Sequence, residues 1–253
     1  MGGIMDVDHV DQAIVENYRQ LRTRIGLIAL AFPVVLIAAG AYWGIGIQPT
    51  LSDYYFAKDP VGARIDIYPV RLWFCGILFV IGVFLYGYQG FSVNEDRWLS
   101  LGGLFSLGVA VFPMSLDGKS DFGLFAQLGL PQLSLHGICA VLAFLCIAVV
   151  IFWYSESTLS KLKTADPAAY RRFKAAYFFI GIYMALSIGI SVILHYLDKR
   201  QNSFILFAEW SGIWAFAAYW FVKNWEISCV APVLKAQGGK KPPKSEAEIA
   251  DAI

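Results

Sequence analysis

The chain has 253 residues, of which 58% are hydrophobic and only 15% are charged, and its formal net charge is +1. This apolar fraction is more than one soluble core of this size needs, so the composition indicates a protein that faces lipid. The near-zero net charge, without a basic stripe in any folded segment, excludes a nucleic-acid-binding surface.

Six apolar stretches are long enough to cross a bilayer, whose hydrocarbon core of about 30 Å requires roughly twenty residues of helix. Their continuous hydrophobicity favours helices over a β-barrel, in which apolar and polar residues alternate. The expected fold is therefore all-α, a polytopic transmembrane bundle of about six helices. The predicted spans cover, in chain order, residues 25–46, 70–91, 99–116, 133–154, 173–196 and 204–222.

The two ends of the chain differ from this bundle in composition. Residues 1–24 are predicted to form a cytoplasmic, amphipathic N-terminal segment. Residues 25–228 form the predicted six-helix transmembrane domain. Residues 229–253 contain clustered glycine, lysine and proline, so we expect a cytoplasmic and disordered tail.

The distribution of lysine and arginine predicts the orientation of the spans. If the N-terminus is cytoplasmic, the inner segments carry 14 of the 20 basic residues and the outer segments carry six. Cytoplasmic flanks of membrane proteins carry the positive excess, so both termini are expected inside. The short loops fit a multi-pass protein of the cell inner membrane.

Small residues recur every four positions in two of the spans. The third span has Gly102, Ser106 and Ala110, and the fifth has Gly181, Ala185 and Gly189. Such stripes let helices approach closely, so they predict packing seams within the bundle or, alternatively, contacts in a homo-oligomer.

Polar residues are predicted to gather at the outer ends of the spans. An ionisable side chain inside a membrane segment is costly, which makes each one a candidate functional residue. The inner half has fewer such groups, and there Lys223 and Glu226 are expected to reach the interface with their long side chains. The predicted outward-facing, ligand-binding cluster consists of Ser52, Asp53, Arg71, Asp117, His136, His195 and Glu209.

Three interpretations of this cluster are open. Two imidazoles and a carboxylate suit zinc or non-haem iron, so His136, His195 and Glu209 form a candidate metal site, although no H-x-x-x-H or H-E-x-x-H spacing accompanies them. Alternatively, these groups only hydrogen-bond between helices, with Arg71 paired to Asp53 or Asp117. In the third interpretation, Glu209 and His195 titrate in a proton-coupled carrier.

Several segments together resemble a group of membrane proteins. They are SDYYF after the first span, RLWFCGILFVIGVFLYGYQG in the second, VAVFP closing the third, the histidine at the start of the fourth and FAEWSGIWAFAAYWFVKNWE in the sixth. This combination is similar to bacterial six-span integral membrane proteins of unknown function. The resemblance implies a six-helix bundle and no particular activity.

A fainter resemblance is to the CREST superfamily of membrane metal hydrolases, which includes alkaline ceramidases and adiponectin receptors. These proteins use a Ser/His pair, an Asp and an H-x-x-x-H in a seventh span. Here Lys199 stands four residues after His195, and no seventh span is visible.

The leading functional hypothesis is therefore an integral membrane binding or accessory protein. Its outward pocket would bind a lipid, a small molecule or a partner protein, and it would work within a larger membrane complex or as a homo-oligomer. The first alternative is a metal-dependent hydrolase of a lipid amide or ester, in which metal-bound water attacks the carbonyl. The second is the proton-coupled carrier.

Overall fold

A computed structural model of the protein describes residues 7–58, 67–112, 134–197 and 204–238, and within these four stretches the regular structure is entirely helical. The prediction of an all-helical protein is confirmed for this part of the chain. The elements are α1 (Val7–Tyr42), the 3₁₀ turn η1 (Ser52–Tyr55), α2 (Arg71–Gly87), α3 (Val93–Val111), α5 (Leu135–Val149), the π-helical turn η3 (Val150–Tyr154), α6 (Glu156–Leu159), α7 (Leu162–Ala165), α8 (Pro167–Tyr196) and α9 (Phe204–Gly238).

Four helices in the described part of the chain are long and apolar enough to cross a membrane, which indicates a multi-pass membrane protein. They cover Glu16–Tyr42, Leu135–Leu159, Pro167–Leu194 and Phe204–Val233. The other two predicted spans coincide with α2, an apolar helix of 17 residues, and with α3, whose first turn carries Glu95 and Asp96.

Two helices extend beyond the predicted domain boundaries. No proline interrupts residues 7–32, and α1 runs without a break from Val7 through the expected boundary at residue 24. Similarly, α9 continues past residue 228 and ends at Gly238, where two consecutive glycines disfavour further helix. The described part of the expected C-terminal tail is therefore helical.

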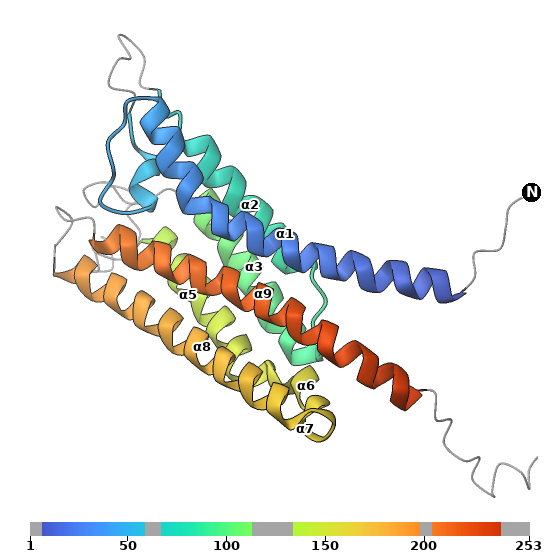
Figure 1. The fold of residues 1–253 in the computed structure, drawn as a ribbon. Coiled ribbons are helices and arrows are strands. Elements are labelled where there is room, and N and C mark those ends of the chain that lie inside the picture. Colours follow the sequence, from blue (N-terminus) through green and yellow to red (C-terminus); the bar gives the residue numbers. More distant parts are fainter. Residues whose placement is uncertain (1–6, 59–66, 113–133, 198–203, 239–253) are drawn as a thin grey trace, which may run out of the picture.

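The helices form a bundle in which neighbours in space are mostly neighbours in sequence (Figure 1). α2 packs against α3, α3 against α5, and α8 against α9, while α1 lies between α2 and α9. The start of α1 and the end of α9 project from the same end of the bundle, and η1 lies at the opposite end. In the most apolar window of each helix, half of the α9 residues are buried but only 22% of the α8 residues, so α9 is central and α8 peripheral.

Close approach of α2 and α3 depends on Gly103, which lies against the backbone of Gly82. A Cβ atom on Gly103 would lie 2.6 Å from the carbonyl oxygen of Gly82 and 2.6 Å from the amide nitrogen of Tyr86. Real side chains do not approach backbone atoms so closely, so only glycine at position 103 permits this helix pair.

The predicted small-residue seams are found in part. In α3, Gly102, Ser106 and Ala110 are all buried. In α8, Gly181 packs against the ring of Phe152, whereas Ala185 is exposed on the helix surface. The stripe of small residues in the fifth span therefore does not lie wholly within the bundle, because Ala185 faces outward.

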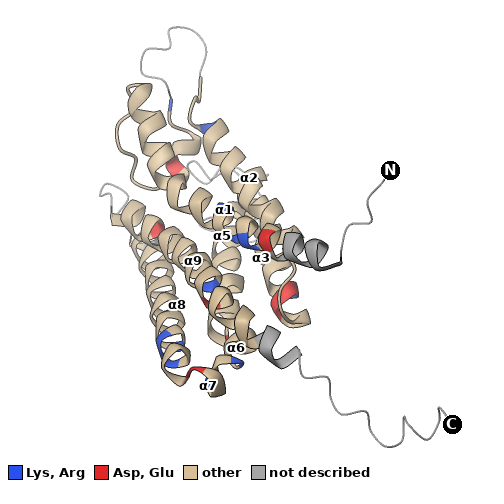
Figure 2. Ribbon diagram, turned by 45° about the vertical axis from the view of Figure 1, so that its right-hand side comes forward, with Lys and Arg blue, Asp and Glu red and all other residues tan. Residues whose placement is uncertain are grey.

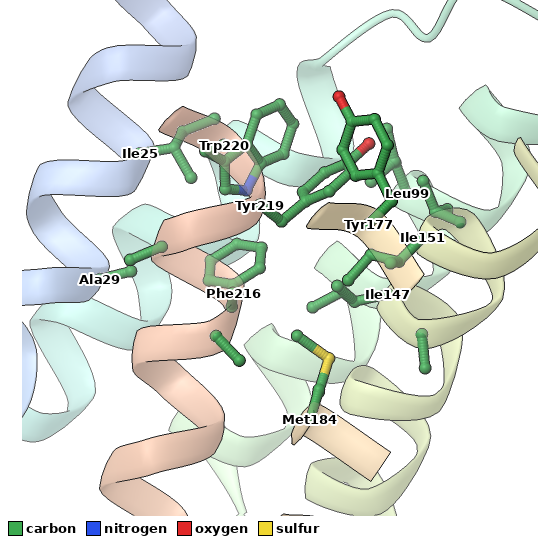
Figure 3. Packing of buried hydrophobic residues seen from close by; sticks show 14 of the residues in the cluster. Ile25, Ala29, Leu99, Ile147, Ile151, Tyr177, Met184, Phe216, Tyr219 and Trp220 are labelled. Atoms are coloured by element: carbon green, nitrogen blue, oxygen red, sulfur yellow. The ribbon is translucent and has the colours of Figure 1, made fainter. Parts of the chain in front are cut away.

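The core at the centre of the bundle is aromatic and aliphatic (Figure 3). Trp220 and Tyr219 of α9 are at most 1% exposed, and their rings lie 5.3 Å apart between centroids. Around them lie side chains from α1, α3, α5, η3 and α8, namely Ile25, Ala29, Leu99, Ile147, Ile151, Tyr177 and Met184.

Charged residues gather mostly at the end of the bundle that carries α6 and α7, and the middle of most helices lacks them (Figure 2). This is the end from which α1 and α9 project. Below, it is called the α7 end, and the opposite end, which carries η1 and the start of α2, is called the η1 end.

Candidate functional site

The loop after α1 turns back over the η1 end of the bundle. Gly44 has a φ of 70°, a left-handed conformation that glycine adopts without strain, and the Ile45 amide donates to the carbonyl of Gly40 at 2.8 Å. Gly40 also leaves room for the ring of Tyr54, because a Cβ there would lie 2.8 Å from that ring. Burial of Tyr54 raises the pKa of its phenol.

Ser52 and His136 meet at this end. The Ser52 Oγ lies 3.0 Å from the His136 Nε2, and the Nδ1 of the same ring lies 3.0 Å from the carbonyl oxygen of Phe112. His136 is only 4% exposed and its ring stacks on Phe74, with 24° between the ring planes. The contact therefore joins η1, the end of α3 and the first turn of α5.

Glu209 reaches the same loop from α9. Its Oε2 accepts a hydrogen bond from the Leu51 amide at 2.7 Å. A second link lies one turn earlier in the helix, where the Leu206 amide donates to the carbonyl of Pro49 at 2.9 Å. The residue that precedes Ser52 is thus held against α9, and Ser52 itself against α5.

Arg71 supports the loop from the start of α2. Its Nε donates to the carbonyl of Tyr55 at 2.9 Å, and its guanidinium carbon lies 4.3 Å from the ring centroid of Tyr55 and 4.0 Å from that of Tyr68. The Asp53 amide donates to Thr50 Oγ1 at 2.9 Å, which closes the turn before η1. The side chains of Arg71 and Thr50 thus help to hold the loop.

A cavity of about 110 Å³ lies between this loop and five helices, α1, α2, α3, α5 and α9. Ser52 and Glu209 line it at the η1 end, and Ser106 is its other polar residue. The rest of the lining is apolar and consists of Phe32, Leu51, Phe74, Leu78, Ile81, Val109, Ala140, Ala143, Phe144, Ile147, Ile213 and Phe216.

The structure brings together part of the predicted cluster. Ser52 and Glu209 line the cavity, and His136 contacts Ser52. Asp53 lies in the same loop and Arg71 against it. Asp117 falls outside the described residues. His195 is in the last turn of α8, and its side chain falls outside what the structure describes.

The predicted metal site includes His195, whose side chain the structure does not describe. No three His, Cys, Asp or Glu side chains in the part of the chain that the structure describes are placed to share an ion. Both ring nitrogens of His136 are engaged, one with a carbonyl and the other with a hydroxyl. A zinc or iron site at His136, His195 and Glu209 stays a prediction that depends on His195.

A second polar cluster lies at the α7 end, and here the expectation for Lys223 and Glu226 is wrong. Their side chains are 1% and 0% exposed, and the Lys223 Nζ lies 3.2 Å from the Glu226 Oε2. Lys223 also donates to Thr158 Oγ1 at 2.8 Å and to the Ser155 carbonyl at 3.4 Å. Tyr177 of α8 donates to Glu226 as well. The pair is thus enclosed by protein, and its side chains do not extend to the surface of the bundle.

Two further buried charges flank this pair. Glu95, 1% exposed, accepts hydrogen bonds from the Phe91 amide at 3.0 Å and from Ser157 Oγ at 3.1 Å, both at Oε2. Arg22, 2% exposed, donates to Tyr88 Oη at 3.3 Å. Sequence reasoning missed this cluster, although the spacing of three residues between Lys223 and Glu226 puts them on one face of a helix.

The function of the chain has to be inferred from these two clusters and the cavity. The resemblances to six-span bacterial proteins and to the CREST superfamily stay predictions. Comparison of the chain with protein-family models, curated proteins and solved structures gives no match.

Proposed function

We propose that the protein is a six-span inner-membrane binding protein whose pocket, at the η1 end of the bundle, takes a small amphiphilic ligand from the non-cytoplasmic side. The cavity beneath the η1 loop is the observation that carries this proposal. Pockets for small molecules are mostly apolar with a few convergent polar groups, and this lining has that composition.

The shape and chemistry of the cavity favour a particular kind of ligand. An apolar cavity of about 150 Å³ holds benzene, so 110 Å³ suits an apolar group of a few carbons. Ser52 and Glu209 at the η1 end match a hydroxyl, an ester or an ammonium group on the ligand. We therefore infer a small amphiphile with one hydrogen-bonding polar group and a short apolar part.

The orientation rests on charge and on the arrangement of helix ends. The start of α1, the end of α9, and α6 and α7 lie at one end of the bundle, and the sequence puts its basic excess on that side. By the positive-inside rule this end faces the cytoplasm, so the cavity lies toward the outside. A reporter fused after Ile253 that is active only outside the cell would contradict this orientation.

Photolabelling tests the pocket. Purified protein in micelles is irradiated with 3-azibutanol, a small alcohol that carries a diazirine, and the labelled residues are identified by mass spectrometry. We expect labels on cavity residues, and we expect Ala143→Phe to remove them, because Ala143 lines the cavity and is 6% exposed.

Ala185→Phe is the matched control. Ala185 is exposed on α8, so the same added ring there should leave cavity labelling intact. If the label is spread over exposed residues such as Phe179 and Leu186, and Ala143→Phe does not change it, the pocket is not a binding site.

A further inference from the structure

The hydrogen bonds of His136 determine which ring nitrogen carries the proton. A carbonyl oxygen can only accept, so the Nδ1 of His136 donates to Phe112. In the neutral imidazole the lone pair is then on Nε2, and the Ser52 hydroxyl donates to it at 3.0 Å. A serine bonded to a histidine that a third group orients is the arrangement in which a general base activates a nucleophile.

The ring of His136 is also held in place by its surroundings. It lies in the first turn of α5, where Ser134 caps the helix by accepting from the Gly137 amide at 3.0 Å. The ring stacks on Phe74, and its centroid lies 6.0 Å from that of Phe74. A fixed base beside a fixed hydroxyl removes much of the orientational cost of proton transfer.

Ser52 is the member of this pair that lines the cavity. Its hydroxyl therefore has the base on one side and the space for a ligand nearby. In η1, the backbone around it is held by the bond from the Leu51 amide to Glu209.

We propose that Ser52 is a nucleophile for acyl transfer, with His136 as its general base, and that the substrate is a small neutral carboxylic ester. This proposal rests on the proposed function, because the ester occupies the same cavity. Ser52 Oγ attacks the ester carbonyl carbon as its proton moves to His136 Nε2. The carbon–oxygen bond to the alcohol then breaks, and the alcohol takes that proton.

Water completes the reaction. His136 Nε2 accepts a proton from a water molecule that attacks the acyl-Ser52 carbonyl, and the bond to Ser52 Oγ breaks. Ser52 Oγ takes back the proton, and a carboxylic acid leaves. One ester and one water thus give one alcohol and one acid.

Covalent labelling tests the nucleophile separately from binding. Purified protein in micelles is treated with diisopropyl fluorophosphate, and the adduct is located by peptide mass spectrometry. Hydrolysis of 4-nitrophenyl butyrate is followed in parallel. We expect an adduct at Ser52, no adduct there in Ser52→Ala, and unchanged labelling in Ser211→Ala, whose hydroxyl donates to the Ala208 carbonyl of its own helix.

His136→Gln tests the base, since glutamine can still donate to the Phe112 carbonyl but cannot accept the proton. We expect the labelling and hydrolysis rates to fall at least about 100-fold. Thermal unfolding of each variant checks that it is folded, and the Ser52→Ala result stands if His136→Gln is not.

The outcomes separate the two proposals. An adduct at another residue, or a Ser52 adduct whose rate His136→Gln does not change in folded protein, overturns the assignment of the nucleophile and base. No adduct, together with 3-azibutanol labelling of the cavity, overturns the acyl-transfer proposal and leaves the binding pocket in place. If 3-azibutanol does not label the cavity of the unmodified protein, the proposed function itself is overturned.

Discussion

The buried pair of Lys223 and Glu226 gives a quantitative test of the fold. The two charges are 3.2 Å apart and their side chains are at most 1% exposed. At an effective dielectric constant of about 20, this separation corresponds to an attraction of about 5 kcal/mol. Removing one partner leaves the other charge buried, and such changes cost about 3–5 kcal/mol.

We expect Glu226→Gln to fall near the lower end of that range. Lys223 would keep its bonds to Thr158 Oγ1 and the Ser155 carbonyl, together with the ring of Phe91, whose centroid is 5.4 Å away. The expected loss in free energy of unfolding is about 3 kcal/mol. The double variant Lys223→Met with Glu226→Gln buries no charge from this pair, so it should lose much less than the two single changes together.

The exposed pair of Lys174 and Glu156 is the matched control. Its atoms are closer, at 2.6 Å, but its side chains are 58% and 48% exposed. Exposed ion pairs contribute about 0–1 kcal/mol, so Glu156→Gln should have little effect. Unfolding by sodium dodecyl sulfate in mixed micelles, followed by circular dichroism, measures all variants. A loss below about 1 kcal/mol in Glu226→Gln, or losses that add in the double variant, would refute the burial of this pair.

Two further predictions concern packing. Gly103→Ala should destabilise the protein by about 1–3 kcal/mol in the same unfolding assay, because the new methyl group would meet the backbone of Gly82. Gly76→Ala is the control: nothing lies within 4 Å of a Cβ at that position, so this change should be neutral or slightly stabilising. Arg71→Lys keeps the charge but loses the planar group that packs on the loop and donates to Tyr55, so it should cost about 1–2 kcal/mol and speed hydrogen exchange in the η1 loop. Unchanged exchange would mean that the loop is held without Arg71.

The helices could be predicted from the sequence because hydropathy alone places them. Within the described residues, a helix covers most of each of the six apolar stretches, since backbone polar groups in an apolar stretch must bond within the segment. Helix ends were less predictable. α9 continues to Gly238 because polar residues such as Lys223 and Asn224 do not stop a helix, although they mark the end of an apolar stretch.

The sequence predicts which residues lie at the η1 end of the bundle, but it does not predict which of their side chains contact one another. Counting residues along the spans puts Ser52, His136 and Glu209 at one end of the bundle, and the structure agrees. The bond between Ser52 and His136 depends on the path of a loop and on the rotation of α5 about its axis. Hydropathy carries no information about either, so the sequence could not distinguish this pair from residues scattered around the rim.

The burial of Lys223 and Glu226 at the α7 end was not predicted, because the residues that bury them come from other helices. Lys223 lies one residue after the predicted end of the sixth span, where a long side chain usually reaches water. Instead, Thr158 of α6 accepts a hydrogen bond from Lys223, and Thr158 and Tyr177 of α8 both donate to Glu226. A short helix such as α6, with the sequence Glu-Ser-Thr-Leu, has no hydropathy signal that would predict this role.

The two clusters differ in how their polar groups are hydrogen-bonded. Lys223 has three N–H groups and three acceptors around it, so its bonding capacity is met by the protein. Ser52 and Glu209, by contrast, have protein partners on one side and line a cavity on the other. The bonds of Lys223 favour one arrangement of the helices, although the buried Oε1 of the nearby Glu95 has no hydrogen-bond partner among the described residues. Polar groups that line a cavity can still bond a ligand. The Lys223–Glu226 pair therefore stabilises the packing at the α7 end, and Ser52 is the residue at which the proposed chemistry is tested.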